Sequence, residues 1–161
     1  MGASSRLVVV ARVPEADDLV ARGRPPDGLG AHVTLVAPMV DRDPEVVRAA
    51  IAAALRDVTP VGVRFARVGR FESGVLFLAP DDPTPFDDLA RRLCAALGVV
   101  DPRPYVAHLT LARARDEAAI EEVERVVREG GPVLSRIAAV GLYRREGPGP
   151  WREVASVPLV V

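Results

Sequence analysis

Two histidines are the residues best placed for chemistry in this 161-residue chain, because both lie in the same tetrapeptide pattern. The first copy is His32-Val33-Thr34-Leu35 and the second is His108-Leu109-Thr110-Leu111. An imidazole titrates near neutral pH and can take or give a proton, and a threonine hydroxyl can donate a hydrogen bond. The chain has no other histidine, so the repeat contains every imidazole of the protein.

The alternation within each tetrapeptide is typical of a strand with one buried face. Side chains at positions i and i+2 of a strand share a face. His32 and Thr34 are therefore expected on one face of their strand, and His108 and Thr110 on one face of another. Where two such faces share a groove, the imidazoles can act as base and acid, and the hydroxyls can bind phosphate oxygens. The pattern predicts displacement at phosphorus without a metal.

A metal site and a cysteine nucleophile are the other chemical interpretations. Two histidines without a nearby cluster of carboxylates or cysteines supply too few metal ligands, so we expect no metal and no cofactor. Cys94 is the one cysteine and lies among the apolar positions of an expected helix, which is typical of a buried, unreactive thiol.

Composition and charge limit the class of protein. Apolar residues make up 49% of the chain and charged residues 27%, as in ordinary globular domains, which excludes a disordered chain. The net charge of −1 argues against a broad nucleic-acid surface held by electrostatics. Neither a bilayer-spanning apolar run nor a secretory signal opens the chain, so we expect a cytoplasmic protein that does not contact membranes.

The elements around the two motifs repeat along the chain. Each half is expected to contain a strand, a helix, a Pro-rich loop, a strand with the motif, a helix and a strand. The expected strands cover residues 5–13, 31–37, 61–71, 75–79, 105–112, 132–144 and 153–161. A short helix is expected over 14–22, and longer ones begin at the caps Asp43, Thr84 and Asp116.

This repeat predicts a single domain, residues 1–161, of mixed α+β (α/β) structure with two pseudo-symmetric lobes. The lobes are expected at about residues 5–71 and 74–145, closed by a C-terminal strand at 152–161. Since no linker separates them, we expect the lobes to pack together, with helices covering one face of each sheet. We expect the protein to be a monomer.

The motifs and their surroundings resemble the 2H phosphoesterase superfamily, the 2′-5′ RNA ligase-like proteins, over essentially the whole chain. The segment AHVTLVAPMV is similar to the first family motif, RPYVAHLTLAR to the second, and VGRFESGVLFLAP to the segment between them. Ala31 and Ala107 stand where a proline commonly precedes the family histidines. The resemblance implies a bilobal fold in which two antiparallel sheets flank a central cleft, with helices on the outer faces.

The resemblance also implies hydrolysis of a cyclic phosphodiester, such as a 2′,3′-cyclic phosphate at an RNA end or in a small nucleotide. His32 and His108 would then be acid and base, and Thr34 and Thr110 would orient the phosphate. Which histidine is the base does not follow from a pseudo-symmetric pattern. A non-catalytic nucleotide- or RNA-binding module and a 2′-5′ RNA ligase are the alternatives.

Three further residues are candidates for the same site. Arg113 is a candidate phosphate ligand because family members carry an arginine there. In an unbroken strand Arg113 would lie on the face opposite the histidines, so it reaches the site only at a bulge or a strand end. Tyr105 and Phe71 could stack a nucleobase, and core packing is the alternative role for both.

Overall fold

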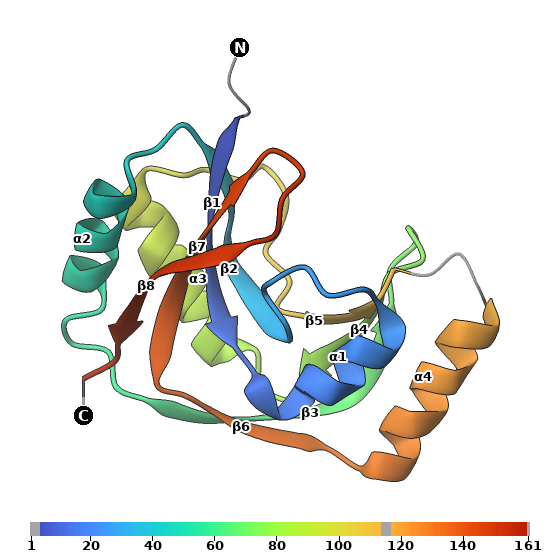
Figure 1. The fold of residues 1–161 in the computed structure, drawn as a ribbon. Helices are drawn as coiled ribbons and strands as arrows, with labels where there is room; N and C mark the ends of the chain where they lie inside the picture. Colours follow the sequence, from blue (N-terminus) through green and yellow to red (C-terminus); the bar gives the residue numbers. More distant parts are fainter. Residues whose placement is uncertain (1–3, 114–116, 161) are drawn as a thin grey trace.

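The computed structural model describes residues 4–113 and 117–160 (Figure 1). The strands within these ranges are β1 (Ser5–Arg12), β2 (His32–Val40), β3 (Val61–Arg70), β4 (Leu76–Pro80), β5 (Leu109–Ala112), β6 (Val133–Ile137), β7 (Ala139–Glu146) and β8 (Arg152–Pro158). The helices are α1 (Asp17–Gly23), which follows a 3-10 turn at Pro14–Ala16, then α2 (Pro44–Ala54), α3 (Thr84–Leu97) and α4 (Glu117–Gly130). The predicted mixture of helices and antiparallel strands is confirmed.

Local sequence accounts for the ends of the longer helices. The Asp43 carboxylate caps α2 by accepting a hydrogen bond from the backbone N–H of Glu45 at 2.9 Å, as expected. The prediction that Thr84 caps α3 is wrong, because Thr84 is the first residue of the helix and its N–H donates to the Asp82 carboxylate. Gly98 ends α3 in the left-handed conformation, at φ +64°. The expected cap Asp116 lies outside the described residues.

The strands form one antiparallel sheet in the order β6-β3-β4-β5-β2-β1-β7-β8. The resemblance implied two separate sheets, whereas here the pairing of β2 with β5 joins the halves into one. That junction has a single pair of facing residues, Val33 and Leu109. The strands that carry the two motifs are therefore neighbours at the middle of the sheet.

Each half of the sheet is covered by its own pair of helices, which lie on opposite sides of Figure 1. Helices α2 and α3 pack together and against the half formed by β2, β1, β7 and β8, with α3 on β2. Helices α1 and α4 pack together against β5 of the other half. Because β3 pairs with β4 and β7 pairs with β1, the two halves of the chain interleave in space.

A continuous segment links the halves a second time. The strand expected over residues 132–144 is divided at Ala138 into β6, which pairs with β3, and β7, which pairs with β1. The Ala138 carbonyl accepts a hydrogen bond from the N–H of Leu159, next to β8, at 2.8 Å. Since one segment serves both halves, the sheet curls around one large hydrophobic cluster, and a second, small cluster contains Val8, Val10, Leu29 and Tyr143.

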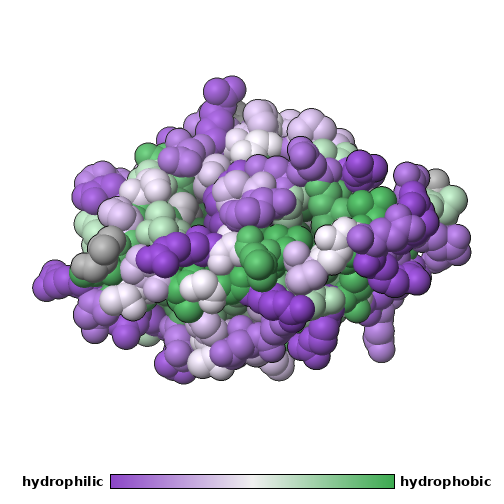
Figure 2. Space-filling view, turned by 90° about the horizontal axis from the view of Figure 1, so that it is seen from below, coloured by the Kyte–Doolittle hydropathy of each residue, from purple (hydrophilic) through white to green (hydrophobic). Residues whose placement is uncertain are grey.

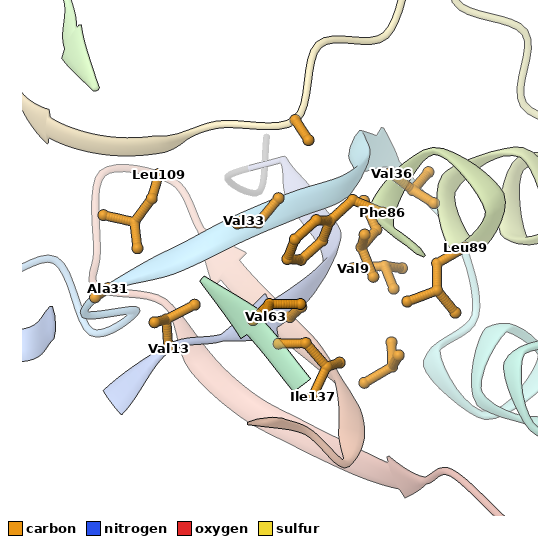
Figure 3. Close-up of a cluster of buried hydrophobic side chains, with 14 of the residues drawn as sticks. Val9, Val13, Ala31, Val33, Val36, Val63, Phe86, Leu89, Leu109 and Ile137 are labelled. Atoms are coloured by element: carbon orange, nitrogen blue, oxygen red, sulfur yellow. The ribbon is translucent and has the colours of Figure 1, made fainter. Parts of the chain in front are cut away.

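The core lies on the sheet face opposite the two histidines. Val33 and Leu109 of the motif strands are fully buried in it, beside Phe86 of α3 and residues of β3 and β6 (Figure 3). In Figure 2 hydrophilic residues cover most of the face seen from below, and hydrophobic residues show between them in separate patches. None of the described helices is long and apolar enough to span a bilayer.

Candidate active site

The register of β2 and β5 brings the two motifs onto one patch of the sheet. Val33 faces Leu109 in an antiparallel ladder, so His32 lies opposite Thr110 and Thr34 lies opposite His108. Side chains opposite one another share a face, and diagonal neighbours in such a ladder lie about 7–8 Å apart, within reach of long side chains. The two imidazoles are therefore diagonal neighbours on one face of the sheet.

Both imidazoles are held in the same way by their own chain. The Nδ1 atom of His32 lies 2.8 Å from the Gly30 carbonyl oxygen, and the Nδ1 atom of His108 lies 2.8 Å from that of Val106. A carbonyl oxygen only accepts, so Nδ1 carries the proton in each ring and donates it there. The Nε2 atom of each ring is left to exchange protons with a substrate.

The charges around His32 favour its neutral form. Burial is the largest effect and lowers its pKa from 6.5 to about 4, despite the hydrogen bond to Gly30. The positive charges of Arg24 and Arg12 lower the pKa as well, and the negative charge of Asp27 opposes them. In the free protein at neutral pH, His32 is therefore a proton acceptor.

Aromatic rings surround His108. The Phe71 ring meets the imidazole edge to face with its centroid 5.0 Å away, and the Phe77 ring does so at 5.8 Å. The two phenylalanine rings stack on each other at 4.3 Å. Phe71, a predicted site residue, thus contacts His108 and is only half-buried.

Phe77 was missed by the sequence reasoning. Phe77 faces Thr110 across the β4–β5 ladder and Gly69 across the β3–β4 ladder. A row of facing residues therefore crosses five strands on one face of the sheet, in the order Gly69, Phe77, Thr110, His32 and Arg12. The available signal was the period-two alternation of 75–79, which places Phe77 on the opposite face from its buried neighbours Leu76 and Leu78.

Tyr105 connects the loop before β5 to the first motif strand. Its hydroxyl donates to the backbone carbonyl of Thr34 at 2.9 Å, and burial raises the pKa of that hydroxyl above its usual value of 10. Tyr105 as a whole is 39% exposed. The structure thus places Tyr105 beside Thr34 with part of its ring open to solvent.

The predicted Arg113 lies just beyond the end of β5 and is exposed. Next to it, the end of α1 lies directly on β5: a Cβ on Gly23 would be 2.2 Å from the Leu111 carbonyl oxygen. This contact brings the neighbouring Arg24 close to Arg113. Burial lowers the pKa of Arg24, Asp27 opposes that effect, and the charge of Arg113 lowers it further.

Among the described residues, no three histidine, cysteine, aspartate or glutamate side chains gather where they could hold a metal ion. Cys94 is half-buried on α3, and burial raises the pKa of its thiol, so the thiolate is disfavoured. The chemistry of the patch rests on imidazoles, hydroxyls and guanidinium groups.

Comparisons with known proteins concern the family and the fold. Residues 11–149 match the family model described as the 2′-5′ RNA ligase superfamily. LigT from E. coli in complex with 3′-AMP superposes with a TM-score of 0.68 at 18% identity, covering 98% of this chain and 99% of that one. TT0787 from Thermus thermophilus superposes with a TM-score of 0.67 at 21% identity, covering 96% and 97%. Among curated proteins, none matches this sequence.

Proposed function

Because this chain belongs to the 2′-5′ RNA ligase superfamily, we propose that it hydrolyses a cyclic phosphodiester, with a 2′,3′-cyclic phosphate at an RNA end or in a small nucleotide as substrate. The observation that carries the proposal is the pair of imidazoles on one patch, each with Nδ1 on a backbone carbonyl and Nε2 available. The fold and the family support an enzyme, and solved relatives hold 3′-AMP and phosphate.

In the proposed reaction His32 is the base. Its Nε2 takes a proton from a water molecule, whose oxygen forms a new bond to phosphorus as the bond between phosphorus and one ribose oxygen breaks. His108 is the acid, and its Nε2 gives a proton to the departing ribose oxygen. The phosphate's negative charge raises the pKa of His32 when it binds, which makes His32 a stronger base in the complex than in the free protein.

The hydroxyls of Thr34 and Thr110 donate hydrogen bonds to the non-bridging phosphate oxygens, where negative charge accumulates in the transition state. Arg113 contributes positive charge at the end of β5. Phe71 and Phe77 offer a stacked aromatic surface next to His108 for a nucleobase, and the partly exposed Tyr105 is a further ring on which a base could stack. These assignments leave the products as a phosphomonoester and a free ribose hydroxyl.

Ligation is the second candidate, because the family description includes it and the same residues serve both directions. A ribose hydroxyl in place of water would give a phosphodiester instead of a phosphomonoester. A binding module of the same fold is the third, and it needs no paired acid and base.

One assay separates the three candidates. The purified chain is incubated with 2′,3′-cyclic nucleotides and with cyclic-ended oligonucleotides, with and without an acceptor oligonucleotide that ends in a free hydroxyl. Hydrolysis gives a phosphomonoester in both cases, ligation gives a longer product only with the acceptor, and a module binds without turnover. His32→Ala and His108→Ala should each lower kcat by a factor of about 10²–10⁴ while the far-UV spectrum is unchanged. Full activity in either variant would contradict the proposed mechanism.

A further inference from the structure

The turn before β2 is held by side chains at three consecutive carbonyl groups. The Nη1 atom of Arg12 donates to the carbonyl of Leu29 and, at 2.9 Å, to that of Ala31. Between them, the Gly30 carbonyl accepts from Nη2 of Arg24 at 2.9 Å and from Nδ1 of His32 at 2.8 Å. The carbonyl that orients His32 is thus itself fixed from both sides.

Arg12 is in turn anchored by Asp17. Its Nη1 and Nη2 atoms donate to the two carboxylate oxygens of Asp17, at 3.2 and 3.1 Å. The carboxylate also accepts from the backbone N–H of Ala31 at 2.8 Å, so both members of the pair bind the turn. A two-point contact of this kind fixes the orientation of a guanidinium group as well as its position.

Glycine at position 30 allows this close approach. Gly30 has φ +64°, and a Cβ there would lie 2.4 Å from Nη1 of Arg12 and 2.7 Å from Oδ1 of Asp17. The backbone of the turn therefore rests directly on the ion pair. Arg12 also faces His32 across the β1–β2 ladder, so the pair, the turn and the imidazole form one contiguous unit.

The second histidine has a much simpler support. The Val106 carbonyl that holds His108 belongs to an exposed residue, and within the described part of the chain the imidazole is its only side-chain donor. The two motifs are alike, but only the carbonyl that orients His32 lies in a turn bound by further side chains. Fold stability alone does not explain why that support converges on the carbonyl that orients the imidazole.

We propose that Arg12, anchored by Asp17, is a positioning residue for His32: through the carbonyls of Leu29 and Ala31 it fixes the turn, and the turn fixes the ring so that Nε2 points to the substrate. The proposal rests on the proposed function only for its effect on turnover. Its structural part, the orientation of the ring, is measured without substrate.

The variants Asp17→Asn and Arg12→Met remove one member of the pair each. Asp17→Asn keeps the size of the side chain and one carbonyl oxygen for the Ala31 N–H, so this variant is the one expected to fold without loss. Asp57→Asn is the matched control. Arg92 likewise donates both to Asp57, at 2.7 Å, and to a backbone carbonyl, that of Ala54, but this pair joins α2 to α3, away from the histidines.

The first measurement is ¹⁵N NMR of the two imidazoles, assigned with His108→Ala. In the unchanged protein His32 should show a fixed Nδ1–H tautomer. In Asp17→Asn and Arg12→Met the ¹⁵N chemical shifts of the two ring nitrogens should approach each other, because both tautomers become populated. The pKa of His32 should rise toward 6.5 as the turn admits water. The charged groups that face the ring are Arg12 on β1, Arg24 after α1 and Asp27 in the turn, and the last two are retained in all variants.

The second measurement is turnover of a 2′,3′-cyclic nucleotide. Both variants should lose at least about tenfold in kcat with KM within about twofold, because a misplaced base slows the chemical step more than it weakens binding. Asp57→Asn should match the unchanged protein in both measurements. The positioning role is refuted if His32 keeps its tautomer and pKa in Asp17→Asn, or if Asp57→Asn changes them equally. Absence of turnover in the unchanged protein would refute the proposed function and leave the NMR result decisive for the positioning.

Discussion

A methyl group at position 69 tests whether the aromatic pair beside His108 contributes to the site. Gly69 faces Phe77 across the β3–β4 ladder, and a Cβ there would lie 2.4 Å from Cζ of the Phe77 ring. Ordinary van der Waals contact begins near 3.4 Å, so in Gly69→Ala the ring must retreat by about 1 Å. The ring moves within the stack that it forms with Phe71, whose centroid is 4.3 Å away.

The size of the effect follows from that stack. An aromatic pair contributes about 0.5–1.5 kcal/mol beyond its buried area. A nucleobase on the Phe77 ring would be held by a stacking interaction of the same kind, and losing that contact lowers kcat/KM by about two- to tenfold, at 1.36 kcal/mol per factor of ten. The free energy of unfolding should change by less than about 1 kcal/mol, because replacing glycine by alanine in a strand restricts the unfolded chain and offsets part of the lost contact.

The assay compares Gly69→Ala with Gly62→Ala, which lies on the same strand and has no atom within 4 Å of the added Cβ. For each variant, kcat/KM is measured on a 2′,3′-cyclic nucleotide and stability by thermal unfolding. Unchanged kcat/KM in Gly69→Ala, or an equal loss in Gly62→Ala, would show that the Phe77 ring does not support the substrate. A large loss of stability in Gly69→Ala alone would show instead that the ring is part of the core.

Three other predictions concern pH, packing and metals. The folded-state pKa of His32, about 4, lies below its unfolded value of 6.5, so the unfolded chain binds the proton more readily and the stability that the neutral ring provides is lost as pH falls from 6.5 toward 4. This difference corresponds to at most about 3 kcal/mol. In urea denaturation, the free energy of unfolding of the unchanged protein should fall by up to that much more than that of His32→Gln over the same pH range. Parallel pH curves for the two proteins would contradict the low pKa. Leu109→Ala should lower the free energy of unfolding by about 2–5 kcal/mol, because Leu109 is fully buried. Leu134→Ala is the control and should change it little, because that side chain is 63% exposed. Similar losses for both variants in chemical denaturation would show that the β2–β5 junction is not a packed part of the core. Dialysis against EDTA should leave turnover of the cyclic nucleotide unchanged, and a loss that added zinc or magnesium restores would refute the metal-independent mechanism.

Local sequence predicted β2 and the buried face of both motifs, whereas the second motif strand is shorter than the expected 105–112, because β5 begins at Leu109 and His108 lies just before it. The alternation in each tetrapeptide depends only on strand geometry, and Val33 and Leu109 are indeed buried while the histidines lie on the other face. The Asp43 cap of α2 is equally local and is confirmed. These features depend on residues within a few positions of one another.

Features that depend on distant pairing were not predicted. The direct pairing of β2 with β5, which makes one sheet of the two expected, is set by packing between strands 76 positions apart in the chain. The division of residues 132–144 at Ala138 arises because one segment pairs with both β3 and β1. Arg12 and Asp17 gave no signal in sequence, since their partner is a turn that folds back onto β1.

The two halves of the sheet are joined in two places. The first is the single facing pair of residues between β2 and β5, and the second is the continuous segment through Ala138 that links β6 to β7. Each imidazole is hydrogen-bonded to its own segment, through the carbonyl two residues earlier in the chain. The orientation of each ring therefore depends on its own segment, whereas the spacing between the rings depends on how β2 and β5 pair.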